Sequence, residues 1–280
     1  MTKKDFIDFR KKMDKLELST TNKLALSSSK TRKELKAVIE NLMNKYGEKE
    51  LSTEIYKYGR STALKTELAT IVSELAKEHK ALIRPFLKVS YTKSFDNVLS
   101  VARLETGKAL IAIEPAPKLL DFALKKEVSG FTWAERITNN RNGLVVKLQS
   151  NVFQGIQNGE SYTTIAKRID NTIGYASKTG VNGGLADSVR IARTESHRIL
   201  NEAQYDSVQA ITKKGVKGYK TWISSRDSRV RDPHISLDGT KIPVEADFKS
   251  PTGATGKGPG MMGNPADDIN CRCILVYSFE

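Results

Sequence analysis

The first eighty residues contain no proline, and apolar residues recur through them with the period of an α-helix. A spacing of three and four residues places side chains on one face of a helix, where they can pack against a neighbour. One such stripe lies between Ser29 and Tyr46, and a second lies between Ser52 and Lys80. We expect two long amphipathic helices, with Leu35, Val38, Ile39, Leu42 and Met43 on the apolar face of the first and Ala63, Leu64, Leu68, Ile71, Val72 and Leu75 on that of the second.

Prolines at two places predict interruptions of the helical pattern. Proline has no N–H to continue a helix, and it biases the preceding residue towards extended geometry. Bends between helices are therefore expected at Arg84-Pro85 and at Glu114-Pro115-Ala116-Pro117. A helix restarts at Thr132, because a threonine followed three residues later by a glutamate, here Glu135, caps the exposed amides of a helix start. That helix is expected to run to about Asn158.

The second half of the chain changes from a helical to a strand pattern. Helices are expected from about Ser161 and again from Leu185 to Thr212, separated by the glycine-rich loop 180–184. Beyond Thr212, short runs of β-branched and aromatic residues predict strands; they are Tyr219–Ile223, Lys241–Val244 and Cys273–Tyr277. The predicted fold class is α+β, mainly α-helical with a small carboxyl-terminal β-sheet. A length of 280 residues is equally compatible with one long domain or two ordinary ones. We expect two, at 1–130, a basic helical region, and at 131–280.

Positive charge is concentrated towards the amino terminus. The net charge is +14, and residues 1–90 carry 20 lysines and arginines against 12 aspartates and glutamates. Such an excess favours a polyanion such as DNA, because binding its phosphates releases condensed counterions. The candidate DNA-binding residues are Lys30, Lys33, Lys36 and Lys45, although a lysine-rich solvated helix surface explains the same pattern. We expect no membrane segment and no secretory signal, since no apolar run is long enough and the start Met-Thr-Lys-Lys-Asp is polar.

Polar and rare residues gather in the last ninety positions. Arg193, His197 and Asn201 are four residues apart and share a helix face, while the loop from Arg226 to His234 alternates charges. Because a buried charge needs a partner, we expect the helix and the loop to pair, for example Glu195 with an arginine of the loop. No catalytic residue is assigned, and the predicted structural network comprises Arg193, Glu195, His197, Trp222, Asp227, Arg229, Arg231, Asp238, Asn270 and Arg272.

His234, Cys271 and Cys273 form a candidate metal site. Two thiolates and an imidazole are ligands that zinc prefers, with Asp227, Asp238 or His197 as a fourth, so a structural zinc is the one cofactor considered. A Cys-x-Cys pair closes no useful loop, and a stabilising disulfide is therefore not expected. A cysteine nucleophile with His234 as its base is a further alternative.

The polar motifs of the last third occur in an order that resembles one known family. This chain is similar to the tailed-bacteriophage minor head proteins, which share the head-morphogenesis domain of the Mu F-like and SPP1-like minor capsid proteins. The resemblance covers roughly the last 110 to 125 residues and rests on Ala192-Arg193-Thr194-Glu195, Trp222, Asp227-x-Arg229-x-Arg231-x-x-His234-x-x-Leu237-Asp238-Gly239, Phe248, Pro259-Gly260, Asn264-Pro265 and Asn270-Cys271-Arg272-Cys273.

The resemblance implies a structural protein of the virion rather than an established enzyme. It implies a few copies inside the head near the portal vertex, assembled in the host cytoplasm, with the portal protein and packaged double-stranded DNA as partners and scaffold and major capsid proteins as further ones. The alternative is a metal-dependent nuclease or other hydrolase that uses Asp227, His234, Asp238 and the cysteines. An ADP-ribosyltransferase is suggested only by Arg193-Thr194-Glu195, and the second half contains no Glu-x-Glu pair. Because the sequence ends seven residues after Cys273, we expect no appended enzyme.

Overall fold

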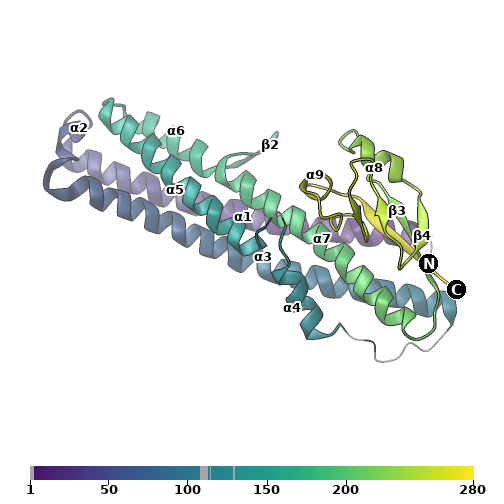
Figure 1. Ribbon diagram of the computed structural model, residues 1–280. Coiled ribbons are helices and arrows are strands. Elements are labelled where there is room, and N and C mark those ends of the chain that lie inside the picture. The colour runs from purple at the N-terminus through teal and green to yellow at the C-terminus, as the bar shows by residue number, and fades with distance from the viewer. Residues whose placement is uncertain (1–2, 108–112, 114, 129) are drawn as a thin grey trace. The chain divides into compact units, whose positions relative to one another are not determined.

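The computed structural model describes residues 3–107, 113, 115–128 and 130–280, with side chains from residue 8 onwards (Figure 1). The chain clusters into two compact units. The first unit draws on the described residues within Met1–Leu18, Arg84–Trp133 and Ala192–Glu280, and the second comprises Ser19–Ile83 and Ala134–Ile191. Each unit therefore takes segments from both sides of residue 130, and neither coincides with the consecutive regions 1–130 and 131–280.

The second unit is built on helices. It contains most of α1 (Lys3–Tyr46), the short α2 (Leu51–Glu54) and η1 (Lys57–Gly59), the first half of α3 (Arg60–Thr106), α5 (Trp133–Gln157) and α6 (Tyr162–Ile173). The hairpin of β1 (Ala176–Ser177) and β2 (Gly180–Val181) follows α6. The two apolar stripes predicted from the sequence supply much of its core, which includes Leu35, Ile39, Met43, Leu64, Leu68, Val72 and Leu75 from the stripes together with Leu148, Val152, Ile165 and Ile169.

Two predicted helix boundaries are wrong. The helix expected from Ser52 is interrupted, because Tyr58 and Gly59 have the positive φ values of 51° and 72°, and α3 begins only at Arg60. The bend expected at Pro85 is absent, and the proline lies inside α3. Proline removes one helical hydrogen bond, but its neighbours Phe86 and Leu87 are buried, and that packing outweighs the loss. The second predicted bend includes Glu114, which lies outside the described residues; α4 (Pro117–Lys125) begins at its last proline.

The first unit combines helices with a small sheet. After α7 (Gly183–Thr212), the strands β3 (Gly218–Ile223), β4 (Lys241–Pro243) and β7 (Ile274–Phe279) form an antiparallel sheet in the order β4-β3-β7. Between them lie α8 (Asp232–Leu237), the hairpin of β5 (Phe248–Lys249) with β6 (Thr255–Gly256), and α9 (Pro265–Asp268). The long pairing of β3 with β7 places Gly218 opposite Phe279 and Ile223 opposite Ile274.

The sheet packs its apolar side chains against two helices. Val98, Leu99, Val101 and Ala102 of α3 and Val208 and Ile211 of α7 share one buried cluster with Trp222, Phe248, Leu275 and Tyr277 of the sheet region. The predicted α+β class, mainly helical with a small carboxyl-terminal sheet, is confirmed (Figure 1). Among the described residues, no helix is both long enough and apolar enough to span a bilayer.

The turn after α6 provides a test of the second unit. Gly174 ends α6 with φ 93° and ψ 158°, a conformation almost restricted to glycine, and a Cβ there would lie 2.0 Å from the backbone oxygen of Asn182. Because a backbone oxygen cannot rotate away, we expect Gly174→Ala to lower the free energy of unfolding by about 3 kcal/mol or more.

The matched control is Gly159→Ala. Gly159 also has a positive φ, 63°, but nothing lies within 4 Å of the added Cβ. Its cost should be only the roughly 1–2 kcal/mol of left-handed geometry. Urea unfolding of both variants measures the difference in the free energy of unfolding. Equal losses of that free energy would show that the contact with Asn182 does not destabilise the Gly174 variant.

Candidate functional site

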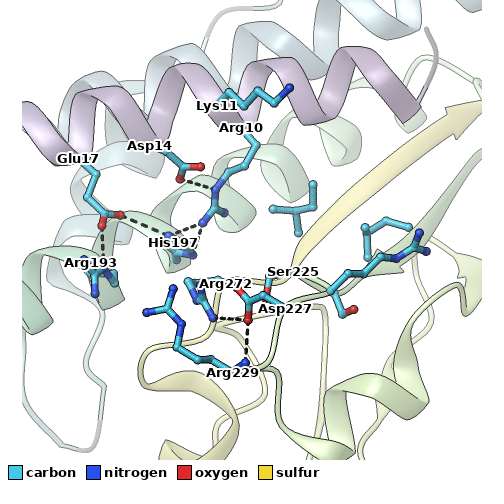
Figure 2. A pocket seen from close by; sticks show the side chains of 14 residues that line it. Arg10, Lys11, Asp14, Glu17, Arg193, His197, Ser225, Asp227, Arg229 and Arg272 are labelled. Atoms are coloured by element: carbon cyan, nitrogen blue, oxygen red, sulfur yellow. Dashed lines mark hydrogen bonds and ion pairs between the residues drawn. The ribbon is translucent and has the colours of Figure 1, made fainter. Parts of the chain in front are cut away.

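A pocket of about 480 Å³ lies within the first unit (Figure 2). Its walls come from the start of α1, from α7, from the loop that follows β3, and from the segment that leads into β7. We call it the arginine pocket, because six cationic side chains line it; they are Arg10, Lys11, Arg193, Arg226, Arg229 and Arg272.

The helical wall of the arginine pocket is an ion network between α1 and α7. Glu17 lies 2.7 Å from Nε of Arg193 and 3.4 Å from Nε2 of His197. The Arg10 guanidinium lies 3.0 Å from Nδ1 of His197 and also bonds Asp14 at 2.9 Å. The same guanidinium nitrogen also lies 2.5 Å from Nε2, so Arg10 contacts both ring nitrogens of His197.

The titration of these groups agrees with that arrangement. Burial, together with the positive charge of Arg10, lowers the pKa of His197 to about 4, so the ring is neutral at physiological pH. Burial acts to raise the pKa of Glu17, but hydrogen bonds from His197 and Arg193 outweigh it and lower the pKa to about 2. Asp14, Glu17 and His197 are close enough together to hold a cation, but the guanidinium of Arg10 already supplies one there.

The loop wall of the arginine pocket is held by two aspartates. Asp227 pairs with Arg272 at 2.6 Å and accepts from the backbone N–H of Arg229 at 2.9 Å. These contacts, with Arg272 first among them, lower the pKa of Asp227. Asp238 pairs with Arg226 at 2.9 Å and accepts from the backbone N–H of Ser224 at 2.8 Å.

The charges of the arginine pocket do not balance. Its acidic lining residues are Asp14, Glu17 and Asp227, against six cations. Two carboxylates outside the lining, Asp238 and Asp8, pair with Arg226 and Lys11, so the excess is one positive charge. The Arg229 side chain is exposed, and no ion pair of its guanidinium is seen within the described part of the chain. An excess of positive charge in a concave surface suits an anion, and guanidinium groups suit the oxygens of phosphate or carboxylate.

The structure pairs Glu195 differently from the sequence-based expectation. Its ion-pair partner is Arg198 on the same helix, at 2.8 Å, and both residues are buried. Arg198 also bonds Glu202 and donates to the backbone oxygen of Ala123 at 2.6 Å. Residues one turn apart on a helix are neighbours without any long-range folding step. For this reason Glu195 pairs with Arg198 rather than with an arginine of the loop.

Other members of the predicted network contact the backbone or the core. Arg231 donates to the carbonyl oxygens of Asp267 and Ile269. The N–H of Asn270, a residue with φ 57°, lies 3.3 Å from the Thr194 hydroxyl and so links α7 to the segment before β7. Asn201 donates to the carbonyl oxygen of His197. Trp222 is fully buried, with its ring 5.4 Å from that of His234 and 5.2 Å from that of Phe248.

His234, Cys271 and Cys273 do come together, and we call them the sulfur–histidine cluster. Nδ1 of His234 lies 3.7 Å from Sγ of Cys271 and 3.5 Å from Sγ of Cys273. All three residues are buried, and both cysteines are free. Chiefly because the Cys271 thiol donates to it, and also because of His234, the pKa of Cys273 is lowered to about 5. The pKa of Cys271 is raised in turn.

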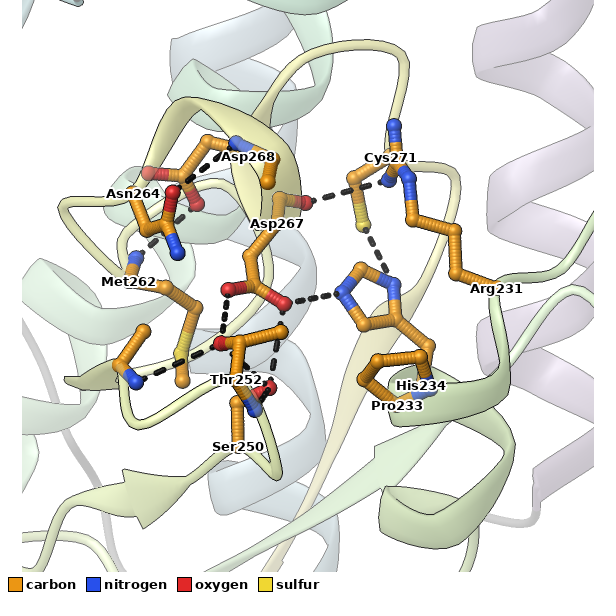
Figure 3. A network of polar contacts seen from close by, with 12 residues as sticks. Arg231, Pro233, His234, Ser250, Thr252, Met262, Asn264, Asp267, Asp268 and Cys271 are labelled. Atoms are coloured by element: carbon orange, nitrogen blue, oxygen red, sulfur yellow. Dashed lines mark hydrogen bonds and ion pairs between the residues drawn. The ribbon is translucent and has the colours of Figure 1, made fainter.

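Sequence reasoning missed the partners of His234. Nε2 of His234 lies 3.1 Å from Asp267, whose carboxylate also accepts from Ser250 at 3.1 Å and from Thr252 at 2.6 Å (Figure 3). The sequence does contain a signal for the start of α9, namely Asn264-Pro265. Asn264 caps this helix and so positions the acidic residues of its first turn. Nothing in the sequence pairs that turn with His234. Arg10 and Glu17 were missed for the same reason.

The proposed fourth ligands do not join the sulfur–histidine cluster. Asp227 and Asp238 are engaged by Arg272 and Arg226, and His197 is engaged by Glu17 and Arg10. Among the described residues, no further histidine, cysteine or carboxylate ligand atom lies within 4.8 Å of all three. The expected hydrolase constellation of Asp227, His234, Asp238 and the cysteines is therefore not assembled.

The four candidate DNA-binding lysines lie on α1 in the second unit and differ in their surroundings. Lys36 pairs with Asp170 at 2.7 Å, and Lys30 lies 3.7 Å from Glu78. Lys45 lies over the ring of Tyr46. Lys33 is exposed, and no ion pair is seen for it in the described structure.

Known proteins share much of this chain. The family model described as "Phage Mu protein F like protein" matches residues 146–276. Minor head protein GP7 of Bacillus phage SPP1 is 30% identical over 253 residues, which cover 89% of this chain and 78% of that protein. The NAD(+)–arginine ADP-ribosyltransferase EFV of Enterococcus faecalis is 29% identical over 149 residues, which cover 53% of this chain but 29% of that protein. No solved structure matches.

The match to GP7 extends over both structural units, since 89% of the chain is aligned. The family model includes the second half of α5, all of α6 and α7, and the segment from β3 into β7. It therefore contains the loop wall of the arginine pocket and the sulfur–histidine cluster. The chain therefore belongs to the Mu F-like family of phage minor head proteins.

Proposed function

We propose that this chain is bound at the portal vertex inside the head, where it contributes to head morphogenesis and contacts packaged DNA through the arginine pocket. Its resemblance to the minor head proteins supports the location, and the relative GP7 is itself named a minor head protein. The observation that carries the DNA contact is the clustering of six cations around the pocket, with Arg229 exposed and without an ion pair of its guanidinium in the described structure.

Phosphate is the anion that fits the arginine pocket within a DNA-filled head. Arg193 and Arg272 pair with Glu17 and Asp227, which fix the positions of both guanidinium groups in the pocket wall. Arg229 and Lys11 are exposed at the pocket and can reach a phosphate. Contacts of this kind position DNA without reading its sequence, and that suits a protein that meets any part of a packaged genome.

The lysines of α1 provide a second, weaker contact. Lys33 is the candidate most able to bind DNA, because it is exposed and Lys36 is paired with Asp170. Contact with the portal, scaffold or major capsid protein is part of the proposal on family grounds. The hydrolase alternative gains no support from the geometry, because its carboxylates are paired elsewhere.

The DNA contact is tested by removing the two exposed cations. We expect the double variant Lys11→Gln/Arg229→Gln to bind double-stranded DNA several-fold more weakly, with the slope of log K against log salt smaller by about one per lost phosphate contact. Fluorescence anisotropy over a salt series measures both quantities. The control Lys77→Gln/Lys213→Gln removes the same charge from exposed sites outside the pocket. If the two double variants lose affinity equally, only net charge matters and the pocket has no DNA-binding role.

A structural role predicts that incorporation into particles depends on the buried ion network. Arg198→Ala removes a buried cation from Glu195 and Glu202, of which Glu202 keeps a pair with Lys126 at 3.1 Å, and it should cost roughly 3–5 kcal/mol of stability. We expect the variant to be absent from purified particles. The control Arg190→Ala, on the same helix, breaks only an exposed pair with Asp187 and should cost less than about 1 kcal/mol. Normal incorporation of a destabilised Arg198→Ala protein would contradict the proposed role of the network.

The location is tested by quantitative mass spectrometry of DNA-filled particles that carry this chain. We expect it at far fewer copies than the major capsid protein, and to be cross-linked to the portal protein. Its absence from particles, together with abundance in the infected-cell lysate, would contradict a virion location and favour a transient assembly factor.

A further inference from the structure

We propose that His234, Cys271 and Cys273 bind a zinc ion that fastens α8 to the start of β7 in the carboxyl-terminal part of the first unit. This site is separate from the arginine pocket and does not depend on the proposed DNA contact. Its ligands are Nδ1 of the histidine and the two Sγ atoms.

The distances in the sulfur–histidine cluster match the edges of a zinc tetrahedron. Zinc bonds of about 2.3 Å to sulfur and about 2.0 Å to nitrogen, at tetrahedral angles, place each sulfur about 3.5 Å from the nitrogen. The observed separations of Nδ1 are 3.7 Å from Cys271 and 3.5 Å from Cys273. Two edges of the tetrahedron thus already have the length that such an ion requires, and all three ligand atoms lie within 4.8 Å of one another.

The outer contacts of His234 present the correct nitrogen to the metal. Asp267 accepts from Nε2 at 3.1 Å, so the proton stays there and the lone pair of Nδ1 faces the sulfurs. The Asp267 side chain is buried at 1% exposure and is held by the hydroxyls of Ser250 and Thr252 (Figure 3). A carboxylate behind a histidine ligand is the usual way in which proteins orient an imidazole towards zinc.

A buried donor next to the cluster gives an independent indication. Trp222 is fully buried, and its Nε1 has no hydrogen-bond partner within the described structure. Its ring lies 5.4 Å from that of His234. A zinc-bound thiolate keeps its negative charge and accepts N–H···S hydrogen bonds, so metal binding would provide this indole with the acceptor it lacks.

Burial decides between a structural ion and a reactive cysteine. Cys271, Cys273 and His234 are 3%, 2% and 2% exposed. Arg272 and Ile274 line the arginine pocket, whereas Cys271 and Cys273 belong to the buried core, as alternation along an extended chain requires. A nucleophilic thiolate needs access to substrate, which the core does not offer. The described residues provide three ligands, so the proposal requires solvent as the fourth.

The test is metal analysis of the intact protein, purified without chelators. We expect about one zinc per chain by inductively coupled plasma mass spectrometry, and loss of thermal stability when a chelator removes it. Replacement by Co²⁺ should give the sulfur charge-transfer absorption and the intense visible bands of a tetrahedral site. Cys273→Ser and His234→Gln should abolish these bands. Asp267→Asn should retain binding with 10–100-fold weaker affinity.

Leu275→Ala is the matched control, because Leu275 is a fully buried neighbour on β7 that is not a ligand. It should lower stability and still bind one metal ion. A wild-type protein that binds neither Zn²⁺ nor Co²⁺, or that retains the metal after both cysteines are changed to serine, would overturn the proposal. Should the ligand variants fail to fold, the Co²⁺ spectrum of the wild type alone decides the matter.

Discussion

The first unit depends on a guanidinium buried in the middle of a helix. Arg198 is 1% exposed and lies among two glutamates of its own helix and the backbone oxygen of Ala123. A buried cation is tolerated only when its donors are satisfied, so the end of α4 and the surface of α7 must keep these positions. A Cβ on Gly260 would come within 3.1 Å of the Arg198 backbone, which shows how closely the loop before α9 approaches the same point.

On that face of α7, Arg198 pairs with glutamates of its own helix. Neighbouring residues of α7 can therefore take part in the surface pocket. Arg193 and His197 contact the start of α1 through Glu17 and Arg10, and together they form one wall of the arginine pocket. The segment before β7 then has two different faces. Arg272 closes the opposite wall of the pocket, whereas Cys271 and Cys273 point to the core and meet His234. One short extended segment thereby connects a charged surface with a buried polar cluster.

Local patterns predicted the elements of this fold, and long-range pairing limited what they could say of the site. The stripes of Leu35 and Leu68 correctly placed two helices, because helical periodicity is a property of neighbouring residues. The continuation of α3 through Pro85 was missed, since packing overrides local preference there. The interruption at Tyr58 was also missed; it is a backbone feature, with positive φ at Tyr58 and Gly59 and no buried residue in η1. The grouping of His234 with the two cysteines was foreseen from residue chemistry, but Asp267 was not.

The sequence by itself determined the mainly helical class, the small terminal sheet, the excess of positive charge and the motifs that relate the chain to the minor head proteins. These follow from composition, period and order along the chain, which require no knowledge of contacts. The pair of Glu195 with Arg198 is local to one helical turn, and the structure shows that it is the pair that forms. Only the tertiary structure decided that Glu17 and Arg10 reach His197, and that Asp267 supports His234. Each of the last two sets joins residues far apart in sequence. A charged side chain specifies that it needs a partner, but the packing of helices and strands specifies which one it finds.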